Sequence, residues 1–311
     1  MHLCLGTTPA LQGTMIFPRV VAAEVNRASE VFFHASGKPI NVARALHTLG
    51  EESLVCVPLG GRTGDICRGD LGKSGIEFEA IETKSTTRTC VTLIDQSRHE
   101  ATELVQEAEK LSASEIARLK KEFLRALPGA KMALLSGSLA PGVKKDFYAD
   151  CCAAAGRCGV PVILDARGPE MLQALKHRPL VVKPNRQELS ATMDKPLKNR
   201  AALKRAMLDL CRQGARWAIV TMGPEGAMVC DGQKFWEIPA IQIDVVSPIG
   251  SGDAFAAGLS CAIRRGREIP DACRLATACA AANALIPGAG RLRLADVRKI
   301  EKMVRILRMR A

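Results

Sequence analysis

The chain has 311 residues, of which 47% are hydrophobic and 24% are charged, the composition of an ordinary soluble globular protein. No apolar run reaches the ~18–20 residues that a membrane-spanning helix needs, so we expect no membrane partner. The opening residues, MHLCLGTTPALQG, contain neither the basic stretch nor the long apolar stretch of a secretory signal, and we therefore expect a cytoplasmic protein.

The formal net charge of +12 raises the question of a nucleic-acid partner. The basic residues are scattered, however, and aromatic residues, which stack on single-stranded bases, make up only 4% of the chain. The densest basic run, residues 296–311, places Val297, Ile300, Val304 and Leu307 at helical spacing and predicts a closing helix with a solvated basic face. We therefore expect no nucleic acid to bind, whereas the positive charge would also suit a small anionic substrate.

The 12 cysteines include no C-x-x-C pair and no spacing with histidine that is typical of zinc sites. Most lie in apolar or alanine-rich surroundings, as Cys151, Cys152, Cys261 and Cys279 do. They are interpreted as reduced residues that fill core space, and none is predicted to be a catalyst.

The first half of the chain contains β-prone, rather polar segments without a following helix. Residues 13–20 and 87–95 are of this kind, and they predict a small sheet standing off the main one, built from segments at about 11–35 and 86–105. Residues 41–50 predict a helix, and the preceding HASGKPI is interpreted as a turn that carries a lysine. No repeat or linker divides the chain, so residues 1–311 are expected to form one domain.

The second half alternates short apolar runs with helical patterns. The runs at 131–137, 161–166, 180–185 and 217–223 are too short for helices, and helical patterns occur at 145–157, 187–193 and 199–213. This alternation predicts an α/β fold whose parallel strands are buried on both faces.

Each of these runs ends in polar or glycine residues. They are Ser136-Gly137-Ser138, Asp165, Lys183-Pro184-Asn185 and Thr221-Met222-Gly223. Ligands bind at the carboxyl ends of the strands in open α/β sheets, so four such endings together predict one rim of a site. A single ending of this kind is better explained as a turn.

The stretch VSPIGSGDAFAAGL places a glycine-rich turn and then a carboxylate before an alanine-rich helix. The N–H groups of Gly250, Ser251 and Gly252 can point at a phosphate, because a helix N-terminus attracts anions. Asp253 would then lie beside the transferred group and accept the proton of an attacking hydroxyl. The alternative is an ordinary N-cap, for which Asp is also well suited.

Several motifs in order resemble the ribokinase-like, PfkB-type carbohydrate kinases. IGSGDAFAAG resembles the G-A-G-D motif of that family, SGKPINVARALHTLG resembles its N-terminal glycine-lysine motif, and LLSGSLAPGV, VILDARG, KPNRQEL and TMGPEGA resemble its internal blocks. The match covers about residues 1–290 and is nearest the branch of 1-phosphofructokinase and tagatose-6-phosphate kinase. It implies a three-layer α/β fold with a β-sheet lid, ATP-dependent phosphorylation of a sugar phosphate, and a homodimer through the lids.

Carried over position by position, the resemblance assigns four groups of site residues. Asp253 is the catalytic base, and Gly250, Ser251 and Gly252 form the anion hole. Mg²⁺ is held, through water, by Asn185 and Glu188, whose hard oxygen donors suit that ion. The nucleotide side takes Lys183, Thr221, Gly223, Gly226 and Asn283. The acceptor side takes Gln12, Arg27, Gly37, Lys38, Asn41 and Arg88.

The resemblance assigns the phosphate already present on the sugar to Arg27, Lys38 and Arg88. A dianionic substrate needs two or three cations, and Arg suits bidentate contact with phosphate. These three are expected to gather on the lid side of a cavity, opposite the N–H groups of residues 250–252, with Asn185 and Glu188 facing it.

Four departures from the family pattern all lie on the acceptor side. Gln12 stands where the family has Asp, Pro39 follows the lysine instead of Gly, and Cys90 and Val105 replace Asn. We therefore expect an active kinase with an altered acceptor, acting on fructose 1-phosphate, fructose 6-phosphate or tagatose 6-phosphate. The alternatives are a kinase of an unphosphorylated sugar or nucleoside, and a non-catalytic sugar- or nucleotide-binding protein.

Overall fold

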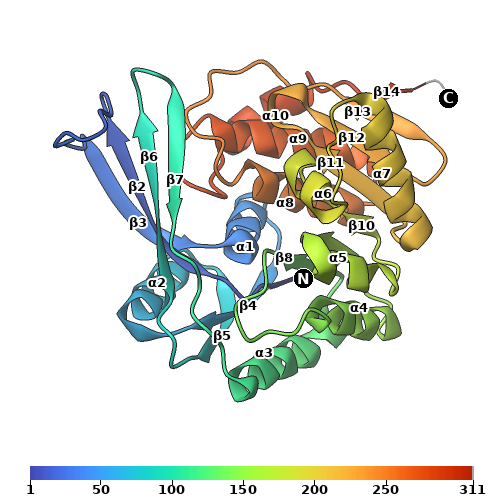
Figure 1. Ribbon diagram of the computed structural model, residues 1–311, viewed down its shortest axis with the longest axis horizontal. Helices are drawn as coiled ribbons and strands as arrows, with labels where there is room; N and C mark the ends of the chain where they lie inside the picture. The colour runs from blue at the N-terminus through green and yellow to red at the C-terminus, as the bar shows by residue number, and fades with distance from the viewer. Residues whose placement is uncertain (310–311) are drawn as a thin grey trace.

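The computed structural model describes residues 1–309, and a ten-stranded sheet runs through its body in the order β14-β13-β12-β11-β10-β9-β8-β1-β4-β5 (Figure 1). Seven neighbouring strands are parallel: β1 (His2–Leu5), β4 (Ser53–Leu59), β5 (Glu77–Glu82), β8 (Met132–Ser136), β9 (Val162–Asp165), β10 (Val181–Val182) and β11 (Trp217–Thr221). Antiparallel strands complete one edge: β12 (Ala227–Cys230), β13 (Phe235–Ile238) and β14 (Leu307–Arg308).

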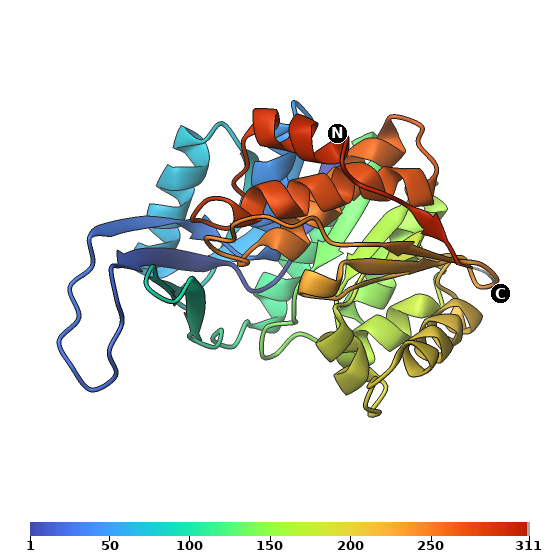
Figure 2. The same ribbon diagram turned by 90° about the horizontal axis from the view of Figure 1, so that it is seen from above.

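Helices cover both faces of this sheet (Figure 2). One core is shared with α1 (Lys38–Thr48), α2 (Gly61–Lys73), α8 (Ser251–Arg264), α9 (Ile269–Ala284) and α10 (Leu294–Glu301). The other is shared with α3 (Ala113–Ala126), α4 (Phe147–Arg157), α5 (Gly168–Leu175), α6 (Arg186–Thr192) and α7 (Arg200–Gln213). Short 3₁₀ turns occur at Leu127–Gly129 and Gly223–Glu225. Because strand side chains alternate between faces, Cys4 packs in the first core and Leu3 and Leu5 in the second.

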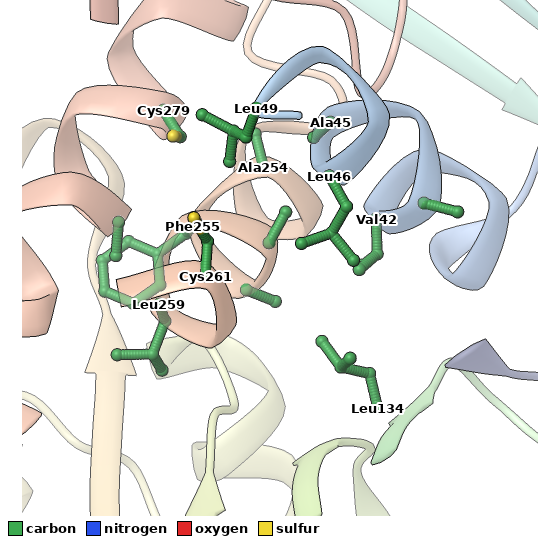
Figure 3. Close-up of a cluster of buried hydrophobic side chains, with 14 of the residues drawn as sticks. Val42, Ala45, Leu46, Leu49, Leu134, Ala254, Phe255, Leu259, Cys261 and Cys279 are labelled. Carbon is green, nitrogen blue, oxygen red and sulfur yellow. The ribbon is translucent and has the colours of Figure 1, made fainter. Parts of the chain in front are cut away.

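The first core fixes the position of α8, whose N-terminus carries the glycine-rich turn. Figure 3 shows Val42 and Leu46 of α1 beside Ala254 and Phe255 of α8. On its other side α8 meets α9 at Gly258, where an added Cβ would lie 2.8 Å from the Leu275 carbonyl oxygen. Gly258 therefore lets α8 lie close to α9, and packing on α1 and α9 together fixes where the N-terminus of α8 lies.

A separate four-stranded sheet, in the order β3-β2-β6-β7, forms the lid at one side of the body (Figure 1). Its strands are β2 (Ala10–Phe17), β3 (Glu30–Ser36), β6 (Arg88–Asp95) and β7 (Glu100–Val105), which lie within one residue of the segments predicted for it. The inner face buries Gln12, His34 and Thr92, whereas the outer face leaves Phe33 and Leu104 about half exposed. The fold thus has three layers and a lid, as the sequence predicted.

Two local predictions are wrong. The segment HASGKPI is not a turn, because His34–Ser36 end β3 and Lys38 already begins α1, with Pro39 in its first turn, where no N–H partner is needed. The closing helix ends at Glu301, and Leu307 lies in β14, where it pairs with Glu237. Pairing with the sheet edge overrides the helical pattern there, and Arg310 and Ala311 lie outside the described residues.

The cysteines are free, and ten of the 12 are buried, so the prediction that they fill core space is confirmed. Within residues 1–309, no helix combines the length and the apolar character that crossing a membrane requires. Across the same residues, no group of three or more His, Cys, Asp or Glu side chains is arranged to hold a metal ion.

Candidate active site

The carboxyl ends of four neighbouring strands form one rim. The strands β8, β9, β10 and β11 are consecutive in the sheet and parallel, so Ser136, Asp165, Lys183 and Thr221 follow one another along its edge. Asn185 continues the rim through a parallel bridge to Thr221. The four polar strand ends therefore lie together, as their pattern predicted.

Asp165 is the centre of a buried charge cluster on this rim. Its carboxylate lies 2.9 Å from Lys38 Nζ and 3.1 Å from Lys183 Nζ, and Lys38 Nζ is also 3.3 Å from Glu188 Oε1. Burial alone would raise the pKa of Asp165, but the two lysines lower it. Burial alone would likewise lower the pKa of Lys38, but the carboxylates of Asp165 and Glu188 raise it. Lys38 and Asp165 therefore both stay charged.

The turn before α8 offers unpartnered donors. Gly250 is the N-cap at φ 85°, and an added Cβ would lie 2.6 Å from Ala289 Cα, so only glycine fits. Within residues 1–309, the N–H groups of Gly250 and Gly252 have no acceptor, and the buried Ser251 hydroxyl has no partner. The expectation of three free amides is wrong for Ser251, whose N–H donates to the Pro248 carbonyl at 3.1 Å.

Lys183 adds a positive charge to this turn. A Cβ at Gly252 would lie 3.7 Å from Lys183 Nζ, so the amine lies directly against the glycine. The two free amides, the Ser251 hydroxyl and the Lys183 amine together make a cradle of hydrogen-bond donors at a helix N-terminus. This arrangement suits a phosphoryl group.

Asp253 lies in the first turn of α8 but does not cap the helix. Gly250 occupies the cap position, with no side-chain cap bond, and Asp253 Oδ2 instead accepts a hydrogen bond from Asn41 Nδ2 at 2.7 Å. Asn41 Oδ1 in turn accepts one from the Ser36 hydroxyl at 3.0 Å. Burial raises the pKa of Asp253 to about 6, and the charge of Lys38 opposes that rise. Such a carboxylate can accept a proton near neutral pH.

Asn185 and Glu188 form a reciprocal capping box on α6. Asn185 Oδ1 accepts from the Glu188 N–H at 2.8 Å, and Glu188 Oε2 accepts from the Asn185 N–H at 2.8 Å. Both side chains thus have protein partners, although the Glu188 side chain keeps 17% of its surface exposed. Two lysines face the carboxylates of Asp165, Glu188 and Asp253, which leaves a net negative charge among hard oxygen donors. The donor set therefore fits Mg²⁺ held through water, rather than by direct coordination.

The residues predicted for the nucleotide side lie near the end of β11. Thr221 ends that strand, Gly223 begins the 3₁₀ turn and Gly226 follows it, with φ of 56° and 89°. At Gly226 an added Cβ would lie 2.1 Å from the Ile238 carbonyl oxygen, so glycine is required there. Asn283, in α9, is fully buried and donates to the Ile249 carbonyl at 2.9 Å, which supports the turn before α8.

The three cations predicted for the sugar's phosphate do not gather. Lys38 lies on the rim, paired with carboxylates. Arg88 lies at the base of the lid, where it donates to the Thr8 carbonyl at 3.1 Å and the Gln106 carbonyl at 3.3 Å. Arg27 is exposed in the connection between β2 and β3, which Figure 1 shows at the far end of the lid. The length of β2, roughly 23 Å at 3.3 Å per residue, separates Arg27 from Arg88.

Two other acceptor-side residues have internal partners. Gln12 is buried in the lid, and its Nε2 donates to the Thr92 hydroxyl at 3.0 Å and the Gly13 carbonyl at 3.3 Å. Gly37 is the N-cap of α1 at φ 108°, and a Cβ there would lie 2.9 Å from Pro9 Cα. Gly37 thus permits the close approach of two segments.

The pfkB family carbohydrate kinase model matches residues 11–294. The chain belongs to the pfkB family of carbohydrate kinases. As a member of this family it is a phosphotransferase that acts on a sugar hydroxyl, and the family implies ATP as the co-substrate.

Solved structures agree with this assignment. Phosphofructokinase-2 of Escherichia coli, in complex with potassium, is 26% identical, with 97% of this chain and 98% of that chain covered and a TM-score of 0.88. A Thermotoga maritima protein described as a possible 1-phosphofructokinase is 21% identical over 100% of both chains, with a TM-score of 0.91. Arabidopsis thaliana ribokinase with ribose and ATP is 21% identical over 97% of this chain and 98% of that chain, with a TM-score of 0.74. The last two show the shared ribokinase-like fold alone.

Sequence reasoning did not identify Asp165 as the centre of the charge cluster. It was recognised only as the end of a strand, although it joins Lys38 to Lys183 across the rim. The available signal was a carboxylate at a strand end beside another strand that ends in a lysine. Ser36 was missed because its contact with Asn41 depends on where β3 ends.

A hollow of about 350 Å³ lies away from the kinase site, at the amino ends of β10 and β11. Its lining includes Lys176, Arg178, Arg212 and Arg216, and none of the predicted site residues. Arg212 lies in the last turn of α7, and the other three follow the carboxyl ends of α5 and α7, where basic side chains complement the helix dipole. They are therefore explained as helix-end residues.

The raised pKa of Asp253 predicts the acid limb of the pH profile. The carboxylate is protonated below about pH 6, so kcat/KM should fall tenfold per pH unit there. An Asn41→Ala variant removes the hydrogen bond that favours the charged form, so its midpoint should move to higher pH. Titration of the substrate's own phosphate would leave the two midpoints equal, and that result would contradict the assignment.

Proposed function

We propose that this chain transfers the γ-phosphoryl group of ATP to a hydroxyl of a ketohexose phosphate: fructose 1-phosphate, fructose 6-phosphate or tagatose 6-phosphate. The observation that carries the proposal is the buried Asp253 carboxylate, with a pKa of about 6, at the same helix N-terminus as the unpartnered donors of Gly250, Ser251 and Gly252. A proton acceptor and a phosphate cradle are the two elements that phosphoryl transfer to a hydroxyl requires.

In this mechanism, Asp253 takes the proton of the acceptor hydroxyl as its oxygen attacks phosphorus. Asn41 orients the carboxylate through its 2.7 Å hydrogen bond. Lys183 and the free amides hold the transferred group and stabilise the charge that develops on its oxygens. Bound Mg²⁺, held by Glu188 and Asn185 through water, would neutralise phosphate charge. Thr221, Gly223 and Gly226 would border the nucleotide.

The substrate class is inferred from a related structure and from the position of two cations. E. coli phosphofructokinase-2 is 26% identical to this chain, and its structure in complex with fructose 6-phosphate is known. Arg88 lies at the lid base and Lys38 on the rim, and a sugar phosphate would need such cations. The separation of Arg27 from both weakens the phosphate assignment, so unphosphorylated sugars and nucleosides belong in the test.

An acceptor panel tests the proposal. Phosphorylated product should appear with ATP and Mg²⁺ and one of the three ketohexose phosphates, and not with free sugars or nucleosides. Turnover confined to unphosphorylated acceptors would contradict the substrate class while keeping the chemistry. ATP binding without turnover on any acceptor would favour a non-catalytic binding protein.

We also propose that a second copy of the chain covers the outer face of the lid. Val31, Phe33 and Leu104 share that face and are 50%, 52% and 53% exposed, an apolar strip on the surface of a sheet. A related protein, E. coli phosphofructokinase-2, has a tetrameric inhibited form.

Charged substitutions should therefore separate the copies. Phe33→Asp with Leu104→Asp is expected to convert a dimer into a monomer in light scattering, because burying two carboxylates at the contact is costly. Exposed Ile66, 52% exposed on α2, gives a matched control, and Ile66→Asp should leave the mass unchanged. A wild-type monomer at all concentrations would contradict the proposal.

A further inference from the structure

His34 is a buried polar side chain without a hydrogen-bond partner. Its residue surface is 0% exposed, and neither ring nitrogen has a partner within residues 1–309. The ring stacks on Phe32, with the centroids 5.8 Å apart. A buried polar group left unpaired is destabilising, and such groups are rare in folded proteins. Stacking on Phe32 accounts for a ring at this position, but any aromatic ring would do that, so the two nitrogens need another explanation.

The surroundings keep this imidazole neutral. Burial and the nearby charges of Arg44 and Arg291 lower the pKa of His34 to about 3, and Asp70 opposes them. Arg44 has other hydrogen-bond acceptors, because it donates to the Ala35 carbonyl at 2.8 Å and to Asp70 at 3.0 Å. A neutral imidazole offers one N–H donor and one acceptor nitrogen. That pair matches an uncharged hydroxyl group and not a phosphate, which needs a cation.

His34 lies on the face of the lid that leads to the catalytic base. In β3 it shares its face with Ser36, and the Ser36 hydroxyl contacts Asn41, which holds Asp253. Across the sheet it lies directly opposite Gln12 in the β2–β3 register. Asp253 and Asn41 are each 5% exposed and Gln12 is 3% exposed, so these neighbouring residues are also buried, although less completely than His34.

We propose that His34 recognises a hydroxyl of the acceptor sugar and is a specificity-determining residue of the kinase. The inference rests on the proposed function and adds a contact for the acceptor. Any acceptor that brings a hydroxyl to Asp253 must enter between this carboxylate and the inner face of the lid. Its other hydroxyls then meet the row that holds Ser36 and His34, and a hydroxyl there satisfies the unpaired nitrogens.

Two substitutions separate recognition from packing. His34→Phe keeps a ring on Phe32 but removes both nitrogens, and should lower kcat/KM for the sugar phosphate about tenfold without changing KM for ATP. Its Tm should stay equal or rise, since an unpaired polar group is lost. His34→Gln retains a donor and an acceptor and should keep kcat/KM within a few-fold of wild type. Exposed His47 gives the control, and His47→Phe should change neither constant.

Deoxy analogues of the accepted sugar phosphate identify the hydroxyl. With the wild-type enzyme, the analogue that lacks this hydroxyl should have a kcat/KM about tenfold below that of the full substrate. With His34→Phe, removing the same hydroxyl should cause no further loss in kcat/KM, because the two changes remove the same contact. The proposal would be overturned if His34→Phe lowered kcat/KM equally for every deoxy analogue. It would also be overturned if His34→Phe left kcat/KM for the sugar phosphate unchanged, or raised KM for ATP in parallel.

A measurement on the wild-type protein covers the case in which the variants do not fold. The chain has five histidines, and one neutral imidazole ¹⁵N signal should shift when the sugar phosphate is added and not when ATP is added. If none of the five shifts, the proposal is overturned. This titration measures binding of the sugar phosphate and does not depend on turnover. A lack of activity would therefore contradict the proposed function, while the titration would still test the contact with His34.

Discussion

Replacing Asp253 with Asn should lower kcat about a thousandfold while ATP still binds. The amide keeps the size of the carboxylate and can still accept the hydrogen bond from Asn41, so the turn before α8 should keep its geometry. What is lost is the ability to accept the proton of the acceptor hydroxyl. Assays of product formation measure kcat, and calorimetry measures ATP binding separately.

The same variant should be more stable than the wild type at neutral pH. Burial raises the pKa of Asp253 to about 6, above its unfolded value near 3.8, so the charged form disfavours the fold above pH 6. The gain should be on the order of 2–3 kcal/mol at pH 8 and should shrink towards pH 4, where the wild-type carboxyl is protonated. A variant that keeps its kcat, or that loses stability at pH 8, would contradict the role given to Asp253.

The local sequence pattern predicted most of the strands that surround Asp253. The apolar runs that became β8, β9, β10 and β11 are buried on both faces, so their length and composition indicated parallel strands. Parallel strands end on the same edge, and their polar ends therefore had to meet. The pattern left open whether Asp253 capped its own helix, because that depends on Asn41, which lies 212 residues earlier in the chain.

Contacts across the chain explain what the sequence did not predict. Lys38 was assigned to the lid side from the resemblance, yet it reaches Asp165, 127 residues away, because α1 begins at the rim of the sheet. Gln12 was expected to face the acceptor, yet its amide nitrogen donates to Thr92 on the neighbouring strand. Register and helix starts decide both contacts, and neither is visible in residue types alone.

Replacing Lys183 with Met should reduce the free energy of unfolding by about 3 kcal/mol or more. Lys183 is 2% exposed and Asp165 is 1% exposed, so the substitution leaves a buried carboxylate that, among residues 1–309, pairs with Lys38 alone. Because Lys183 also lies against Gly252, the variant should bind the nucleotide's phosphates less tightly. Urea denaturation followed by fluorescence, and calorimetry with ATP, measure the two losses.

An exposed pair provides the matched control for this loss. Arg125 lies 2.8 Å from Glu79, with 62% of its side chain exposed, so Arg125→Met should leave the free energy of unfolding nearly unchanged. Adding Asp165→Asn to Lys183→Met removes the buried carboxylate that has lost one of its two lysines, and should restore much of the stability but not nucleotide binding. Since the lysines lower the pKa of Asp165, its contribution is lost as pH falls below about 4, and the penalty of Lys183→Met should shrink there. An equal penalty at pH 3 and pH 8 would mean that packing around the Lys183 stem, and not the buried charge, holds the two strand ends together.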